Sequence, residues 1–301
     1  MTTETRHYRI GVVAVSLQSC SEECVRVFDR IYGCYRTEDP CDTALHMKIV
    51  RRKAKPWAAA EYVVQCNGEA YVAGRDERGV MPQLEAALNH QTMLTQNTFF
   101  QLHAGVMSYQ NRAVVFTGKS GTGKSTLAAA LMARGWSYLC DEFALIEPQS
   151  LLVYPFPKAL SIKNAGRDHI QELNLPLISG EWSDGKRMRQ FAYVTPTEAG
   201  SGGIGGPCPV KSVLFLSRRT NMPLRWSRLT APEAAMTLYR CGLNTENLGR
   251  QAFDTAVALA RQAQCFEFNL GSVEESCDAL ESLVSGQCEI DRRGSTSPKG
   301  L

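Results

Sequence analysis

The first hundred residues alternate between apolar positions at strand spacing and apolar positions at helix spacing. Two runs rich in β-branched and aromatic residues flank Asn67-Gly68, a dipeptide that favours a tight hairpin turn. We predict a small α+β domain over residues 1–98, used for docking or oligomerisation. Its predicted elements are strands at 8–16 and 47–50, a helix at 21–32 capped by Ser21, a hairpin at 61–73 and a helix at 81–99.

Near residue 99 the pattern changes, and strand-like and helix-like segments alternate as in an α/β domain. Polar, glycine-rich residues 179–207 predict a mobile loop, which is a candidate lid or substrate clamp. Residues 291–301 are polar and predict a disordered tail, so the α/β domain is expected to span 99–290. Its predicted elements are strands at 102–108, 113–117, 136–140, 210–216 and 266–270, a helix at 124–134, a loop with a short strand at 151–162, and mainly helix up to 286.

The composition is that of an ordinary folded chain, with 44% hydrophobic and 21% charged residues. A net charge of +3 gives no support for a nucleic-acid or membrane-surface partner. No apolar run reaches the roughly 18 residues of a membrane span, and no secretory signal is visible, so we expect a cytoplasmic protein. The eleven cysteines include no C-x2-C pair, which predicts reduced and mostly buried thiols rather than a metal cluster.

One octapeptide carries most of the chemical information, because residues 118–125 match G-x-x-x-x-G-K-[ST] at each fixed position. Glycines let backbone N–H groups wrap a polyphosphate, and the helix that follows adds the positive end of its dipole. A strand pattern before the loop and a helix pattern after it are the context that this motif requires. We therefore predict binding of a nucleoside triphosphate. The predicted nucleotide-binding residues are Gly118, Lys119, Ser120, Gly121, Thr122, Gly123, Lys124, Ser125 and Thr126.

Transfer of a phosphoryl group also needs a metal ion and a proton acceptor. Lys124 is expected to reach the β and γ phosphates, and the Ser125 hydroxyl to ligate Mg²⁺. Asp141 and Glu142 follow an apolar run only seventeen residues after Lys124, which suits the end of a neighbouring strand. Paired carboxylates can divide two tasks, one holding the metal and one accepting a proton. We predict a magnesium site formed by Ser125 and Asp141.

His103 is a further candidate catalytic residue, at the start of the strand before the octapeptide strand. The hairpin between the two strands brings His103 either to the loop end of the sheet or to the opposite end, and the sequence does not decide which. A structural role for this histidine also stays open. We find neither an LSGGQ-like segment nor an N-K-x-D motif, which disfavours transporter ATPases and GTPases.

Together, Leu102-His103-Ala104-Gly105, the octapeptide and Asp141-Glu142 resemble the HPr kinase/phosphorylase family, and most closely the bacterial HPr-kinase-related serine kinases. The motif resemblance covers residues 99–170 well and 210–285 loosely. It implies an α/β P-loop kinase domain of the HPr-kinase type that uses ATP and Mg²⁺.

Carried over by position, the resemblance gives each marked residue a role. Lys124 falls on the phosphate-binding lysine, Ser125 on a magnesium ligand and His103 on the active-site histidine. Asp141 falls on the first acid, and Glu142 on the second acid, which accepts the proton in that family. This chain has glutamate where the family has a second aspartate, so whether Asp141 or Glu142 is the base stays open.

Residues 161–164, Ser-Ile-Lys-Asn, are the nearest counterpart of the family's E-x-R-G element and lack its acid. The later arginine motif of the phosphorylase reaction is not recognisable, so we do not expect the reverse reaction. Lys163 and Lys186 are candidates for contact with phosphate or an acidic peptide, or else solvated surface residues.

The sequence thus favours a kinase that transfers the γ-phosphate of ATP to a serine of a protein or peptide. Two alternatives stay open: a nucleotide-binding regulatory module without transfer activity, and a kinase for a small molecule. The resemblance is also compatible with a homo-oligomer.

Overall fold

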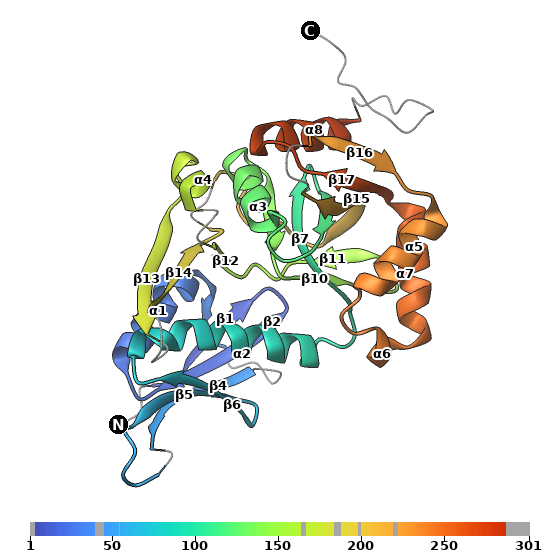
Figure 1. Ribbon diagram of the computed structural model, residues 1–301. Helices are drawn as coiled ribbons and strands as arrows, with labels where there is room; N and C mark the ends of the chain where they lie inside the picture. Colours follow the sequence, from blue (N-terminus) through green and yellow to red (C-terminus); the bar gives the residue numbers. More distant parts are fainter. Residues whose placement is uncertain are drawn as a thin grey trace. The chain divides into compact units, whose positions relative to one another are not determined.

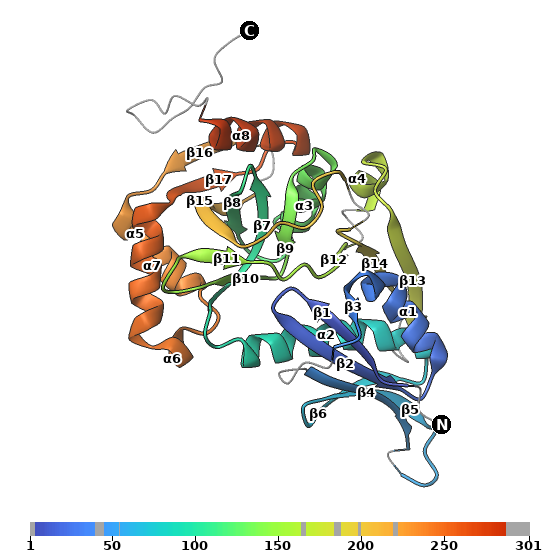
Figure 2. The same ribbon diagram turned by 180° about the vertical axis from the view of Figure 1, so that it is seen from behind.

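The computed structural model describes residues 4–39, 45–53, 55–163, 167–183, 188–197, 200–218 and 222–286. The fold is mixed α/β with several sheets, as Figures 1 and 2 show. The chain forms two compact units that are not contiguous in sequence. The first contains Met1–Gln96, Lys158–Arg167 and Pro176–Thr197, and the second contains Asn97–Pro157, Asp168–Leu175 and Glu198–Leu301.

The first unit is built on a six-stranded sheet in the order β3-β1-β2-β4-β5-β6, in which only the β2–β4 pair is parallel. The predicted strand over 8–16 is two strands, because the chain turns at Gly11 with φ 60°. The helix expected at 21–32 is confirmed, and the Ser21 hydroxyl accepts a hydrogen bond from the Cys24 amide at 3.3 Å. The elements are β1 Arg6–Ile10, β2 Val13–Ser19, α1 Glu22–Tyr32, β3 Arg36–Thr37, β4 Leu45–Arg52, β5 Glu61–Cys66, β6 Glu69–Gly74 and α2 Val80–Thr95, with 3-10 turns at Gly33–Tyr35 and Glu77–Gly79.

The hairpin predicted from Asn67-Gly68 is confirmed, since both residues have positive φ, 47° and 90°, between β5 and β6. Left-handed backbone at both positions matches the twist of the flanking strands.

A three-stranded sheet in the order β12-β14-β13 completes the first unit. Its strands are β12 Leu160–Ser161, β13 Leu177–Ser183 and β14 Met188–Val194. The short helix α4, Arg167–Glu172, belongs to the second unit except for its first residue. These strands pair with one another and belong to the first unit. The boundary predicted at residue 98 would instead place them in the later domain. The loop predicted over 179–207 is therefore wrong for 179–183 and 188–194, which are strands.

The second unit is built on an eight-stranded sheet in the order β11-β10-β7-β8-β15-β17-β16, with β9 paired to β7 and β11 also paired to β15. Strands β8, β15 and β17 are parallel neighbours, and β7 is antiparallel to β8. Its strands are β7 Phe100–Tyr109, β8 Arg112–Thr117, β9 Ser137–Cys140, β10 Phe143–Ile146, β11 Leu152–Tyr154, β15 Cys208–Ser217, β16 Arg225–Arg228 and β17 Gln264–Asn269.

Helices α3 and α8 of this unit pack together, as do α5 and α7, which lie side by side in both views (Figures 1 and 2). Strand β8 is buried at five of its six positions, as expected for a strand inside a sheet that helices cover. The helices are α3 Lys124–Ala133, α5 Ala231–Cys241, α6 Thr245–Leu248, α7 Arg250–Gln262 and α8 Val273–Ser285.

The glycine-rich residues 200–206 form a loop, as predicted, and this loop is hydrogen-bonded to β9. The Tyr138 amide donates to the Gly203 carbonyl, and the Gly205 amide donates to the Tyr138 carbonyl, both at 2.9 Å. A Cβ at Gly202 would lie 2.3 Å from the Trp136 carbonyl oxygen. Glycine at this position therefore permits close approach of two backbones.

We expect Gly202→Ala to lower the free energy of unfolding by about 1–3 kcal/mol, because the added methyl group would force backbone segments apart. Gly206→Ala is the matched control, since a Cβ there has no atom within 4 Å. Urea denaturation measures both changes. Equal stability of the two variants would contradict the close packing at Gly202.

Six of the nine described cysteines are buried, which agrees with the predicted burial of most thiols. Burial raises the pKa of the Cys265 thiol to about 11. In the part of the chain that the structure describes, no helix has the length and apolar character needed to cross a membrane.

Candidate active site

The octapeptide forms the turn between β8 and α3, in the second unit. Gly121 and Gly123 have φ 84° and 113°, a left-handed backbone that favours glycine. Gly118 needs its lack of a side chain for another reason, since a Cβ there would lie 2.8 Å from the Leu216 carbonyl oxygen of β15. The three glycines therefore serve the conformation of the loop and its contact with the neighbouring strand.

The Lys124 side chain turns back onto this loop. Its Nζ donates to the Gly118 carbonyl at 2.7 Å and to the Lys119 carbonyl at 3.4 Å, and the residue is only 6% exposed. The Lys119 carbonyl also accepts from the Thr122 amide at 3.2 Å and the Thr122 hydroxyl at 2.6 Å. This arrangement keeps a positive charge at the centre of the turn, where an anion seated on the loop would meet it.

Ser125 and Thr126 lie in the first turn of α3, and both are half-buried. Amide groups in the first turn of a helix have no partner within the helix, and the helix dipole favours an anion there. The backbone amides of the two residues are thus available to a phosphate group seated at the start of α3.

The register of β7 against β8 settles where His103 lies. Ala104 pairs with Thr117, the last residue of β8, and the Thr117 hydroxyl donates to the His103 carbonyl at 3.0 Å. His103 is therefore at the edge of the sheet from which the octapeptide loop leaves, and not at the opposite end.

The two acids reach the same edge from β9. Cys140, the last residue of β9, pairs with Val106, and the Ala104 amide donates to the Glu142 carbonyl at 3.3 Å. The Glu142 Oε2 atom lies 3.5 Å from the His103 Nδ1 atom, with both side chains about one-third exposed at 31% and 39%. Asp141 is 7% exposed. The structure thus brings His103, Asp141 and Glu142 to the edge that carries the loop.

The neighbouring thiol has no place in this chemistry. Burial, and then the Asp141 and Glu142 carboxylates, raise the pKa of the Cys140 thiol well above its ordinary value. Its Sγ donates to the Ala104 carbonyl at 3.6 Å. Cys140 is therefore a protonated core residue rather than a nucleophile.

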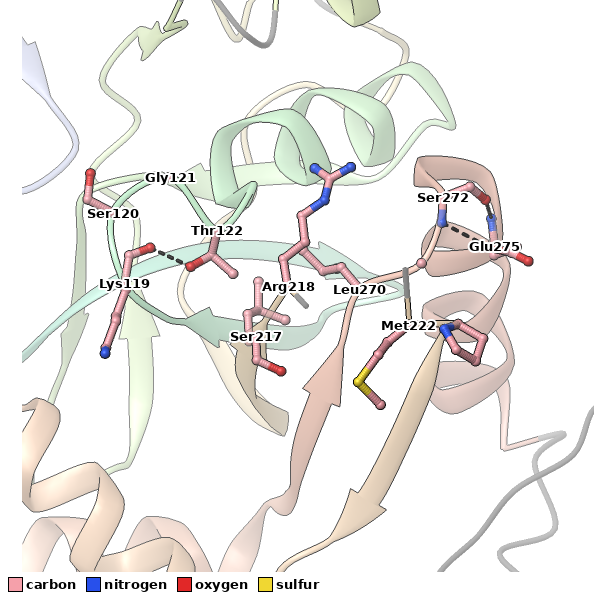
Figure 3. A pocket seen from close by; sticks show the side chains of 13 residues that line it. Lys119, Ser120, Gly121, Thr122, Ser217, Arg218, Met222, Leu270, Ser272 and Glu275 are labelled. Atoms are coloured by element: carbon pink, nitrogen blue, oxygen red, sulfur yellow. Dashed lines mark hydrogen bonds between the residues drawn. The ribbon is translucent and has the colours of Figure 1, made fainter. Parts of the chain in front are cut away.

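A pocket of about 800 Å³ adjoins the loop at this edge. Figure 3 shows that loop residues 119–122 line one part of it. The end of β15, the segment before β16 and the segment from β17 into α8 line the rest. The sequence interpretation missed Arg218, Met222 and Leu270, which also line it. The signal was available, because ligands of α/β sheets bind beyond the carboxyl ends of parallel strands, and β15 and β17 are parallel to β8.

The remaining candidates lie elsewhere. Ser161 ends β12 in the first unit, and the exposed Lys163 lines a groove of about 850 Å³ there, together with residues of β14. Asn164 and Lys186 are outside the described residues, as is the tail predicted over 291–301.

The chain resembles solved structures, one of which is a kinase/phosphatase. No protein-family model and no curated protein matches the chain. A solved structure of the Hpr(Ser) kinase/phosphatase from Coxiella burnetii overlaps it with a TM-score of 0.33 and 15% sequence identity, over 62% of this chain and 89% of that chain. An overlap at this level assigns neither an activity nor a substrate to the chain.

Proposed function

We propose that this protein is an ATP- and Mg²⁺-dependent phosphotransferase that transfers the γ-phosphate to a serine hydroxyl of a protein or peptide. The observation that supports it is the meeting of the octapeptide loop with His103, Asp141 and Glu142 at one edge of a single sheet. Phosphoryl transfer depends mainly on positioning and charge stabilisation, for which a phosphate-binding loop beside carboxylates is suited. The choice of serine rests on the motif resemblance to HPr-kinase-related serine kinases.

The donor set at this edge fits magnesium. The Ser125 hydroxyl and the Asp141 carboxylate offer hard oxygen ligands, which Mg²⁺ prefers. Among the described residues no three His, Cys, Asp or Glu side chains gather into a metal site. Magnesium at a phosphate site is commonly held by one or two protein oxygens together with phosphate oxygens and water. When bound, magnesium would offset the charge of the phosphate groups.

The exposure of the two acids favours different roles for them. Asp141 is nearly buried, which suits a metal ligand, whereas one-third of the Glu142 side chain is exposed and can meet an incoming hydroxyl. Glu142 is therefore the proposed proton acceptor. His103 lies within 3.5 Å of its carboxylate and orients it. Lys124 and the loop amides hold the phosphate groups in line with the acceptor.

The proposal is tested by incubating the full chain with Mg-ATP and a library of serine-containing peptides, and following phosphate on serine by mass spectrometry. Glu142→Gln is expected to lower kcat by about 10²–10⁴-fold, because the acceptor hydroxyl loses its base. The KM for ATP should stay nearly constant, since Glu142 does not hold the nucleotide. Glu246→Gln, an exposed glutamate on α6, is the matched control and should transfer phosphate at the normal rate.

Each alternative has its own outcome in this assay. Binding of ATP without transfer to any peptide or small-molecule acceptor would overturn the proposal in favour of a nucleotide-binding module. Transfer to a small molecule but to no peptide would show that the acceptor is a small molecule and not the proposed peptide serine. Normal transfer by Glu142→Gln would remove Glu142 from the role of base.

A further inference from the structure

The pocket beside the octapeptide loop has the size and position to receive the part of a nucleotide that the loop does not hold. Its volume of about 800 Å³ lies within the range of small-molecule sites, about 300–1,000 Å³. Loop residues 119–122 line it directly, so a triphosphate seated on the loop would place the attached nucleoside in or next to this space.

Part of the pocket lining is apolar. Met222, Pro223 and Leu270 contribute to it, and Met222 leaves 40% of its surface exposed. A methionine thioether makes favourable contacts with aromatic rings and adapts to their shape. In the view of Figure 3, Arg218 extends between the loop that carries Thr122 and the start of α8 at Ser272. A planar guanidinium stacks on aromatic faces.

Several polar side chains in and beside the pocket form hydrogen bonds that fix the segments lining it. The Ser272 hydroxyl accepts from the Glu275 amide at 3.1 Å, and the Glu275 carboxylate accepts from the Ser272 amide at 2.9 Å. Next to the pocket, the Asn269 Nδ2 atom donates to the Pro223 carbonyl at 3.0 Å, and its Oδ1 atom accepts from the Ser217 hydroxyl at 3.3 Å. These hydrogen bonds tie the ends of β15 and β17 to the segment that carries Met222.

We propose that this pocket binds the nucleoside of the triphosphate through apolar contacts with Met222 and Leu270 and stacking on the Arg218 guanidinium. The inference rests on the proposed function and deepens it. Contacts with the faces of a base hardly distinguish one base from another, because every base has a π-face and the hydrogen-bonding groups lie at its edge. Discrimination among purine nucleotides should therefore be small, and GTP should bind about as well as ATP.

Isothermal titration calorimetry of the full chain with Mg-ATP, Mg-GTP and Mg-tripolyphosphate tests the inference. We expect the dissociation constants for ATP and GTP to agree within about fivefold. Met222→Ser should weaken binding of both nucleotides by about tenfold, the loss expected for removing one partly buried apolar side chain. It should leave tripolyphosphate unaffected. Met236→Ser, which alters a similarly exposed methionine on α5 (45% against 40%), is the matched control and should change nothing.

Arg218→Gln is a second variant at an exposed position and should also weaken the nucleotides more than tripolyphosphate. Unchanged nucleotide binding by both Met222→Ser and Arg218→Gln, with ATP and tripolyphosphate bound by the unaltered chain, would overturn the pocket assignment and leave the proposed function standing. A preference for ATP over GTP of a hundredfold or more would overturn recognition by base faces. If the unaltered chain binds neither ATP nor tripolyphosphate, the proposed function is overturned together with the inference.

Discussion

Phosphate transfer by the Lys124→Ala variant is expected to fall about 10²–10³-fold below that of the unaltered chain, the usual loss when one positioned donor to the transition state is removed. Lys124 is buried, and its ammonium group rests on the Gly118 and Lys119 carbonyls at the centre of the loop. The backbone amides of the loop remain in the variant, but the mobile charge that follows the γ-phosphate is gone. Transfer of radioactive phosphate from γ-labelled ATP to a serine peptide measures the change.

The control for charge and side-chain size is Lys48→Ala, at an exposed position on β4. It is expected to transfer phosphate at the normal rate. Circular dichroism of Lys124→Ala should show an intact fold, because the carbonyls that the ammonium group contacts lie in a turn that strands and helix fix on both sides. A folded Lys124→Ala variant with normal transfer would contradict the placement of the γ-phosphate at this loop.

The octapeptide and its surroundings could be predicted because the information is local. The motif fixes the turn, and the apolar runs before and after it define β8 and α3. The end of the sheet at which His103 lies could not be predicted in the same way. It depends on the pairing of Ala104 with Thr117, which in turn depends on a two-residue turn at Gln110-Asn111, where both residues have positive φ of 50° and 59°. A shift of a hairpin by a few residues moves its ends without changing the apolar pattern of either strand.

Strands β13 and β14 escaped prediction for a different reason. The first four residues of β14 are exposed or half-buried, and only the last three are buried, so the strand lacks the alternation that marks a half-buried strand. The reason for the glycines at 200–206 could not be predicted, because glycine is typical both of mobile loops and of close backbone approach. At Gly202 the neighbouring backbone shows that close approach is the reason. The membership of β12, β13 and β14 in the first unit is a property of long-range pairing, which local patterns do not encode.

The largest expected effect on stability lies in that first unit, at the buried ion pair between Lys158 and Glu85. Lys158 is 2% exposed and Glu85 is 7% exposed, and the Lys158 ammonium donates to one carboxylate oxygen of Glu85. The Tyr32 hydroxyl donates to the other oxygen. Burial, and then the Glu85 carboxylate, raise the pKa of Tyr32 well above its ordinary value, so the hydroxyl stays protonated. The pair joins the segment leading into β12 to helix α2.

We expect Lys158→Met to lower the free energy of unfolding by about 3–5 kcal/mol, because it leaves a carboxylate buried without its cation. Urea denaturation followed by circular dichroism measures the loss. The double variant Lys158→Met, Glu85→Gln should recover a large part of it, since the buried charge is then gone and the amide oxygen still accepts from Tyr32. Arg26→Met, which breaks an exposed pair with Glu23 on α1, is the control and should cost less than about 1 kcal/mol. A double variant no more stable than Lys158→Met alone would contradict the uncompensated charge as the cause, and would point to the lost packing of the lysine stem instead.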